Sequence, residues 1–260
     1  MLRPLHDPAA GALRVAGLIS GSGSNLRRIL EHRRALASSR GRATFDVVVV
    51  FSDTWNSRAA EIGRDFDLPV VVRDIAAFYA ARGAPRRDLA LRAEYDAATV
   101  EALRPFGARV AAYAGYMSIA TRPLIDAFLG VNVHPADLAL ELDGRRRFTG
   151  DQAVRDAILA GRPELRSTTH IIEPVVDGGR LLLVSPPVPV VVPPGADLGD
   201  RETARRVAAE HQERLKEGGD WLVFPRTLEW LADGRIAQDE RTGALHLDGK
   251  PIPGGWRMEG

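Results

Sequence analysis

The first half of the chain alternates short apolar runs with segments whose apolar residues recur every three or four positions. Continuous apolar runs are typical of buried parallel strands, and the longer spacing is typical of helices that cover a sheet. The predicted strands are Arg14–Ile19, Phe45–Phe51, Leu68–Val72, Ala108–Ala114 and Gly130–Val133. Because strands that alternate with helices favour right-handed crossovers, the pattern predicts an α/β fold with a doubly wound, mostly parallel sheet.

Helical spacing fills most of the gaps between these runs. The predicted helices extend from Asn25 to about Leu36, from Arg58 to Phe66 and through Leu91–Leu103. Ser52-Asp53-Thr54 is expected to cap the second of them, and Ala76–Arg87 is interpreted as a polar connection. Ligands of such sheets bind at the carboxyl ends of the strands, so the loops there are the candidate site.

The pattern changes after Ser167. Two extended runs, Thr168–Val175 and Leu181–Val192, flank Asp177-Gly178, a pair typical of a β-hairpin. Helices are then expected at Thr203–Lys216 and Trp221–Leu231, with Gly218-Gly219 between them and Gly234 as a C-cap. A last hairpin is expected at Ile236–Leu247, turning at Thr242-Gly243. The predicted organisation is an N-terminal extension (1–13), a main domain (14–235) and a C-terminal hairpin and tail (236–260).

Composition narrows the function classes. With 260 residues and 45% hydrophobic content, the chain suits one large α/β domain. The absence of Cys excludes disulfides and thiolate nucleophiles, and the formal charge of +1 argues against nucleic acid as a partner. No apolar run approaches the roughly 20 residues of a membrane span, and Met1–Leu13 does not resemble a signal peptide. We therefore expect a cytoplasmic protein with no membrane contact.

The stretch Ser20–Asn25 joins the first predicted strand to a helix. Its glycines allow a sharp turn, and the free N–H groups of a helix's first turn favour a phosphate or carboxylate. The same pattern also serves as a purely structural turn. No Lys follows the glycines, so the Walker A motif is incomplete. Leu26 takes the place of a third glycine, so the dinucleotide-binding fingerprint is incomplete too. Asp53, after the second strand, keeps a nicotinamide-dependent oxidoreductase as an alternative.

Asn132 and His134 lie two positions apart at the end of a predicted strand. The period of two points both side chains to one face of the sheet, at its ligand-binding edge. A His there can move protons near neutral pH, and an Asn amide can donate to an oxygen that gains charge. The alternative is a structural His bonded to a carbonyl.

Asp177 occupies a turn where Asp is common for local backbone bonding. A fold that brings it beside His134 would give it a role in orienting the imidazole and accepting a proton. His170, in a buried strand, and His211, in a helix, are expected to be structural. No metal-ligand spacing such as His-Glu-x-x-His appears, so no metal is expected.

Seven short motifs are specific when their order and spacing are taken together. They are Leu18–Leu26 (LISGSGSNL), Ala114–Met117 (AGYM), Asn132–Pro135 (NVHP), Thr169-His170, Asp177–Gly179 (DGG), Glu210-His211 and Leu231–Arg235 (LADGR). Together they resemble the folate-dependent formyltransferase family, and within it the phosphoribosylglycinamide branch. The resemblance covers nearly the whole chain after Arg14.

The resemblance implies a Rossmann-like formyltransferase fold and transfer of a formyl group from the co-substrate 10-formyltetrahydrofolate to a primary amine, with no metal. The first acceptor that the resemblance suggests is glycinamide ribonucleotide, in purine biosynthesis, and the second is a related small amine. A homodimer is compatible with it. A non-catalytic regulator that binds folate or nucleotide is a further alternative.

Roles also follow from the resemblance alone. It implies that the catalytic residues are Asn132, His134 and Asp177. It assigns the substrate phosphate to Gly21, Ser22, Gly23, Ser24 and Asn25. The residues that it places around the substrate and folate are Tyr116, Met117, Val133, Val175, Val176, Gly178 and Gly179. It also implies that Glu210 contacts a hydroxyl of the substrate.

The segment Ala136–Gly150 departs from the family pattern, which has Ser-Leu-Leu-Pro after its Asn-x-His-Pro. Glu213–Trp221 resembles an insertion. Arg145, Arg146 and Arg147 suggest either an anion contact to a substrate or a solvated loop.

Overall fold

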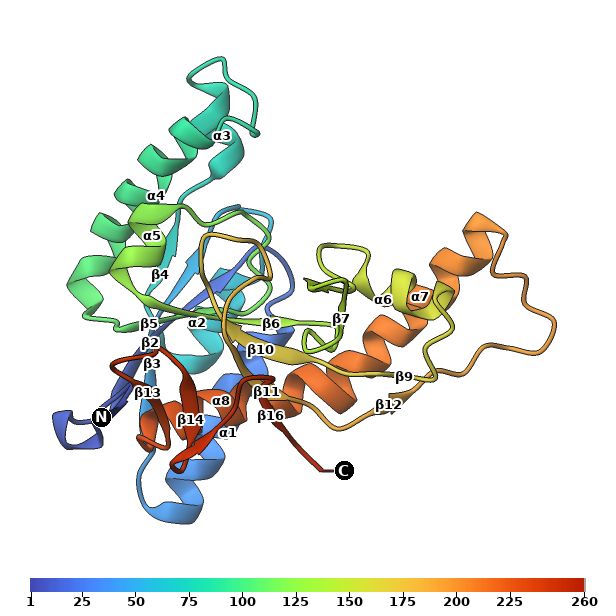
Figure 1. The fold of residues 1–260 in the computed structure, drawn as a ribbon. Helices are drawn as coiled ribbons and strands as arrows, with labels where there is room; N and C mark the ends of the chain where they lie inside the picture. The colour runs from blue at the N-terminus through green and yellow to red at the C-terminus, as the bar shows by residue number, and fades with distance from the viewer. Residues whose placement is uncertain (260) are drawn as a thin grey trace.

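The computed structural model describes residues 1–259 as an α/β fold around an eight-stranded sheet (Figure 1). The strand order is β16-β11-β10-β6-β5-β2-β3-β4. The strands are β2 (Leu13–Ile19), β3 (Phe45–Ser52), β4 (Val70–Val72), β5 (Val110–Tyr113), β6 (Leu129–His134), β10 (Thr168–Ile171), β11 (Leu181–Val184) and β16 (Trp256–Arg257). β4, β3, β2, β5 and β6 pair in parallel, whereas β10 is antiparallel to both β6 and β11. The predicted mostly parallel α/β fold is confirmed.

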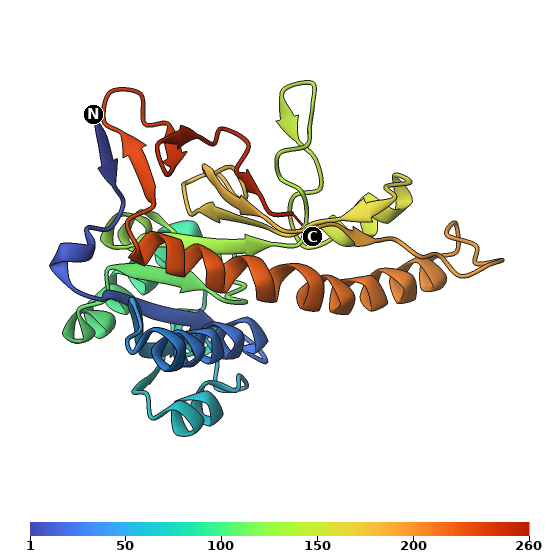
Figure 2. The same cartoon turned by 90° about the horizontal axis from the view of Figure 1, so that it is seen from below.

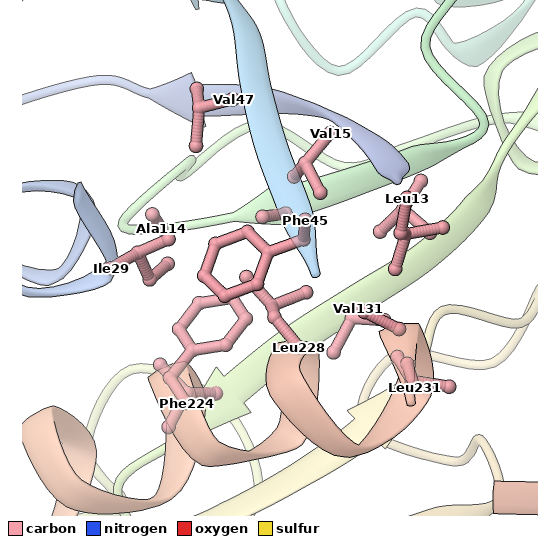
Figure 3. Packing of buried hydrophobic residues seen from close by; sticks show 14 of the residues in the cluster. Leu13, Val15, Ile29, Phe45, Val47, Ala114, Val131, Phe224, Leu228 and Leu231 are labelled. Carbon is pink, nitrogen blue, oxygen red and sulfur yellow. The ribbon is translucent and has the colours of Figure 1, made fainter. Parts of the chain in front are cut away.

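Helices cover both faces of this sheet. On one face Phe224, Leu228 and Leu231 of α8 pack near Phe45 and Val131 of the strands (Figure 3). The helices of this face are α1 (Ser24–Arg40), α2 (Ala59–Phe66) and α8 (Trp221–Ala232), and those of the other are α3 (Ile75–Ala80), α4 (Leu89–Leu103) and α5 (Arg122–Ala127). Alternate residues of the strands enter the two cores, so both faces are apolar. This is why the central strands have continuous apolar sequences.

The predicted hairpin after Ser167 forms, but with shorter strands. β10 and β11 pair antiparallel, and residues 172–180 connect them. The second run stops at Val184 because Pro186 and Pro187 lack the N–H that a ladder requires. The remaining elements of this region are β7 (Glu141–Leu142), β8 (Arg145–Arg146), α6 (Ala153–Leu159), β9 (Glu164–Leu165) and β12 (Val188–Pro189).

The two predicted C-terminal helices are one continuous rod. α7 (Arg201–Leu215) continues through a π-helical turn, Lys216–Asp220, into α8, as the long orange helix of Figure 2 shows. The expected break at Gly218-Gly219 was wrong. A Cβ on Gly219 would lie 2.4 Å from Ser167 Oγ, so this glycine permits close contact with Ser167, the residue before β10, instead of ending the helix.

Two local expectations were also wrong. Ser52-Asp53-Thr54 does not cap α2, which has no side-chain cap; Ser52 Oγ instead accepts from Thr54 N at 3.2 Å. The presumed connection after Ala76 contains part of α3, whose first turn is capped by Asp74. Single turns of 3₁₀ helix are Pro8–Ala10 and Arg104–Phe106.

The two chain ends both join sheets. β1 (Leu2–Pro4) pairs with β13 (Ile236–Asp239) in a small antiparallel sheet that also contains β14 (Leu245–Leu247) and β15 (Lys250–Pro251). β16 pairs with β11 of the main sheet. The division at residues 13 and 235 therefore stays a proposal. Within residues 1–259 no helix is both long and apolar enough to cross a membrane.

Candidate active site

The end of β6 carries Asn132 and His134 on one face of the sheet. Their cross-strand partners on β10 are His170 opposite Asn132 and Thr168 opposite His134. Side chains of directly opposed residues are close neighbours. The antiparallel pairing therefore adds a second histidine to the predicted pair.

Asp177 lies in the connection after β10, in the left-handed backbone region with φ of 53°. Its Oδ1 is 3.5 Å from His134 Nδ1 and 3.7 Å from His170 Nε2. All three side chains are buried, with at most 8% of each exposed. The fold thus brings the predicted Asn132, His134 and Asp177 together at the edge of the sheet.

His170 orients the amide of Asn132. Its Nδ1 lies 2.9 Å from the carbonyl of Ile171, an acceptor, so Nδ1 carries the proton and Nε2 accepts from Asn132 Nδ2 at 3.2 Å. Burial lowers the pKa of His170, which keeps the ring neutral. One amide hydrogen of Asn132 stays available to a substrate oxygen. Sequence reasoning treated His170 as structural, and only the β6–β10 register could have indicated otherwise.

The other nitrogen of His134 is also fixed. Nε2 donates to the carbonyl of Phe148 at 2.8 Å, which leaves Nδ1 facing Asp177. One small region is therefore bordered by the Nδ1 edge of His134, the carboxylate of Asp177 and the amide of Asn132. His170 contacts both Asn132 and Asp177 and so links the amide to the other two groups. That region is where a reacting group could meet a proton donor, a proton acceptor and an amide.

The glycine loop precedes α1 at the neighbouring end of β2. Gly23 is the N-cap of the helix, with φ of 65°, and no side chain caps its first turn. The left-handed backbone favours glycine here, and a Cβ on Gly23 would also lie 2.5 Å from Ile62 Cδ1. Ser20 Oγ accepts from Met117 N at 2.9 Å, and Arg58 N donates to Gly21 O at 3.0 Å. The loop is held in place while its uncapped N–H groups can receive an anion.

Asp220 is a residue that the sequence analysis missed. This carboxylate, in the π-helical turn, accepts from Asn25 Nδ2 at 3.3 Å and from Ser167 Oγ at 2.6 Å. Burial raises its pKa, and Oδ1 of Asn25 has no partner among the described residues. An acid directly after two glycines in a helical stretch was the available signal. Asp220 connects the glycine loop to Ser167, the residue before β10.

The structure does not bring Glu210 to this group. Its Oε1 pairs with Arg206 on the same helix at 3.3 Å. It precedes Asp220 by ten residues of a continuous rod, which corresponds to about 15 Å along the axis. Asp220, not Glu210, is the acid of this helix that contacts the glycine loop.

The other predicted pocket residues divide into two sets. Val133 is buried in the core on the face opposite to His134, and Tyr116 is buried against Phe51 and Tyr113. Burial raises the pKa of Tyr116 well above its usual value. In the second set, Met117, Val175 and Val176 are exposed, and Gly178 and Gly179 follow Asp177 in its turn.

Two further candidate chemistries find little support. Asp53 is 3% exposed and accepts from Ser118 Oγ, so it is not presented to a cofactor ribose and the nicotinamide alternative loses its key residue. Among residues 1–259 there is no group of three or more His, Asp or Glu side chains arranged to hold a metal ion.

Comparison with known families identifies the class. The family described as "Formyl transferase" matches residues 13–213. The chain belongs to this family, and it is a folate-dependent formyltransferase family enzyme. The family uses a formyl-tetrahydrofolate donor and an amine acceptor.

Individual relatives cover most of the chain. Phosphoribosylglycinamide formyltransferase of Escherichia coli (strain K12) is 26% identical over 243 residues, 93% of this chain and 96% of that protein. The crystal structure of glycinamide ribonucleotide transformylase 1 from Symbiobacterium toebii has 28% identity and a TM-score of 0.64, over 91% of this chain and 94% of that one. A formyltetrahydrofolate deformylase from Pseudomonas putida KT2440 shares the fold alone, with 15% identity and a TM-score of 0.62 over 91% and 70% of the chains.

Proposed function

We propose that the protein transfers a formyl group from 10-formyltetrahydrofolate to a primary amine, with glycinamide ribonucleotide as the first acceptor to test. The observation that carries this proposal is the convergence of Asn132, His134 and Asp177 beside the uncapped glycine loop. The relatives with glycinamide ribonucleotide or phosphoribosylglycinamide in their names support the choice of acceptor.

In this proposal the amine nitrogen attacks the formyl carbon, and the formyl oxygen gains negative charge. Asn132 donates its second amide hydrogen to that oxygen, and His134, when protonated, donates from Nδ1. Removal of one such donor typically costs on the order of 10² to 10³ in rate. The buried setting strengthens these interactions because little water competes for the charge.

Asp177 is proposed to handle the proton. It accepts a proton from the attacking amine, directly or through water, and that proton passes to the folate nitrogen as its bond to the formyl carbon breaks. The number of protons is unchanged, so no external acid is needed. A positioned acid or base contributes about 10² to 10⁴ in rate.

The binding roles rest on position. The glycine loop, Gly21–Asn25, is proposed to hold the acceptor's phosphate through uncapped N–H groups. The exposed side chains of Met117, Val175 and Val176 offer apolar surface for the donor's ring system. Asp220, bonded to Asn25, is proposed to fix the loop or to accept from a substrate hydroxyl.

The test is an absorbance assay of donor conversion with the full chain and glycinamide ribonucleotide. Turnover that depends on both compounds, and that falls sharply in His134→Asn, supports the proposal. Turnover with a different amine rejects this acceptor and keeps the reaction. Donor conversion that is independent of any amine indicates hydrolysis, with water as acceptor. Binding of both compounds without turnover contradicts the catalytic role of the three residues.

A further inference from the structure

The segment Glu141–Gly150, which we call the strap, lies against the candidate catalytic group. It begins as the β7–β8 hairpin, the light green hairpin that projects from the molecule in Figure 2, and returns toward the end of β6. The strap belongs to the part of the chain that departs from the family pattern. It contacts both His134 and Asp177, so it is placed to influence them.

Arg146 connects the strap to the turn that carries Asp177. Its Nη1 donates to the backbone carbonyl of Asp177 at 2.5 Å and to that of Gly179 at 2.7 Å. The guanidinium is partly buried, so these charge-assisted bonds are shielded from solvent. One side chain therefore holds the backbone on both sides of Gly178.

Two backbone groups of the strap complete the contact. The N–H of Gly150 donates to Asp177 Oδ2 at 2.8 Å, which turns Oδ1 toward His134 and His170. The carbonyl of Phe148 accepts from His134 Nε2 at 2.8 Å. The strap therefore fixes Nε2 of His134 and Oδ2 of Asp177. The other polar atoms of these side chains, Nδ1 and Oδ1, are directed to the reaction region.

The backbone is strained on both sides of this contact. Phe148 and Asp177 have φ of 58° and 53°, in the left-handed region that non-glycine residues rarely adopt. Such conformations persist where the surrounding structure requires them, and they concentrate at functional sites. Here the strained residue Phe148 aims the carbonyl that His134 contacts.

We propose that the strap is a positioning element of the active site, in which Arg146 fixes the turn that carries Asp177 and Phe148 fixes the ring of His134. This rests on the proposed function of those two residues. Arg146 binds backbone carbonyls, so it is neither an anion contact to a substrate nor part of a solvated loop. Arg145 is exposed, with no side-chain partner among the described residues, and Arg147 stacks on the Phe148 ring at 5.2 Å from its centroid.

The arrangement has a spectroscopic consequence. A carbonyl only accepts, so the neutral His134 ring is held with its proton on Nε2. The charged or titratable groups close to this ring are Asp177 directly, and His170, Arg146 and Asp220 around it. A loosened strap should let His134 populate both tautomers.

The experiment compares Arg146→Met and Arg146→Lys with the matched control Arg145→Met. We expect Arg146→Met to lower kcat on the order of 10²-fold, since small misplacement of reacting groups has costs of this size. KM for the donor should change less than kcat, because Arg146 contacts the backbone at Asp177 and Gly179, whereas the proposed donor surface of this turn is at Val175 and Val176. Arg146→Lys keeps a donor and a charge and should recover part of kcat, and Arg145→Met should match the wild type.

Nitrogen-15 NMR of the free protein provides an activity-independent readout. The wild type should show the Nε2–H tautomer for His134, assigned through His134→Asn, and Arg146→Met should show a mixture. Unchanged nitrogen shifts in Arg146→Met overturn the proposal, as does wild-type kcat with only a lower Tm. If the wild type transfers no formyl group, the proposed function fails while the NMR comparison still decides the strap. If Arg146→Met does not fold, Arg146→Lys takes its place in the NMR comparison. A tautomer ratio between those of the wild type and a free ring is then expected, and a wild-type ratio would contradict the proposal.

Discussion

Asp177 carries its carboxylate on a backbone that most residues avoid. Left-handed geometry costs a non-glycine residue roughly 1 to 2 kcal/mol, although Asp and Asn tolerate it better than others. Glycine at this position would remove the strain and also the carboxylate. That Asp occupies it, 3.5 Å from His134, favours a chemical role over a local turn role.

Asp177→Asn is therefore expected to fold and to lose kcat by about 10² to 10⁴, because Asn keeps the turn and removes the proton acceptor. Steady-state formyl transfer and a thermal melt measure the two effects. The matched control is Asp67→Asn, at the C-cap of α2 with φ of 54° and outside the catalytic group. Wild-type kcat in Asp177→Asn would refute the proton-transfer role.

His170 gives the site a pH signature. Burial lowers its pKa in the folded state, so the unfolded chain binds more protons once the pH falls below about 6.5, the unperturbed value. Stability contributed by the neutral ring is therefore complete above that pH and is lost progressively below it. The free energy of unfolding should fall more steeply between pH 7 and pH 5.5 in the wild type than in His170→Asn.

Urea unfolding at the two pH values measures this difference. His246→Asn, in the terminal hairpin, serves as the control for the loss of a histidine outside the catalytic group. Equal slopes in all three proteins would contradict a neutral, buried His170. The groups facing His170 are Asp177, His134 and Arg146, and their substitution should change its titration too.

At the scale of elements, the central strands were predicted to within a few residues. β2, β3, β5 and β6 are largely buried on both faces, so their sequences are mainly apolar. The rod α7–α8 was not predicted, because Gly218-Gly219 has low helix propensity. Contact of Gly219 with Ser167 overrides that propensity, and such tertiary contacts leave no local signal.

The π-helical turn also yields a prediction. Folded-state burial raises the pKa of Asp220, so its ionisation opposes folding as the pH rises above about 3.9, the unfolded value. Asp220→Asn removes this penalty and keeps an oxygen for Asn25. We expect the variant to be more stable than the wild type at pH 7, with the advantage shrinking toward pH 4.

The same variant should weaken acceptor binding if Asp220 contacts a substrate or fixes the glycine loop. Urea unfolding at pH 7 and pH 4, together with KM for the acceptor, measures both effects. Glu210→Gln is the control on the same rod and should change neither quantity. Lower stability of Asp220→Asn at pH 7 would show that the carboxylate is held by stronger contacts than its two hydrogen bonds.

At the scale of the whole molecule, long-range pairing separates what the sequence predicts from what it does not. Alternation on one strand placed Asn132 and His134 on a common face, and the Asp-Gly turn suggested Asp177. The antiparallel register of β6 and β10, which adds His170, joins segments 38 residues apart. The pairing of β1 with β13 spans most of the chain. Neither pairing has a local pattern, and both become visible only in the structure.

Part of the molecule has its own small core. α6, α7, β9 and β12 form an arm that extends away from the main sheet on the right of Figure 1. Its buried residues form a cluster of their own: Val154, Ala157, Ile158, Leu165, Val207, Ala208 and Leu215. Phe148 of the strap packs against this cluster, so the strap is linked to the arm as well as to the catalytic group.

A small separate core should open more readily than the main one, since local opening follows the apolar contacts that are lost. We expect amide hydrogen exchange to be faster in α6 and the outer part of α7 than in β2, β3 and β5. Leu165→Ala and Leu182→Ala are a matched pair of buried strand leucines, each expected to cost about 2 to 5 kcal/mol in its own core.

Exchange measured by mass spectrometry should rise only in the arm and the strap for Leu165→Ala, and throughout the sheet for Leu182→Ala. Uniform acceleration by Leu165→Ala would show that the arm and the sheet unfold as one unit. Because Phe148 belongs to both the arm core and the strap, a loosened arm should also disturb His134. Leu165→Ala is therefore expected to lower kcat although Leu165 is not among the residues that contact the catalytic group.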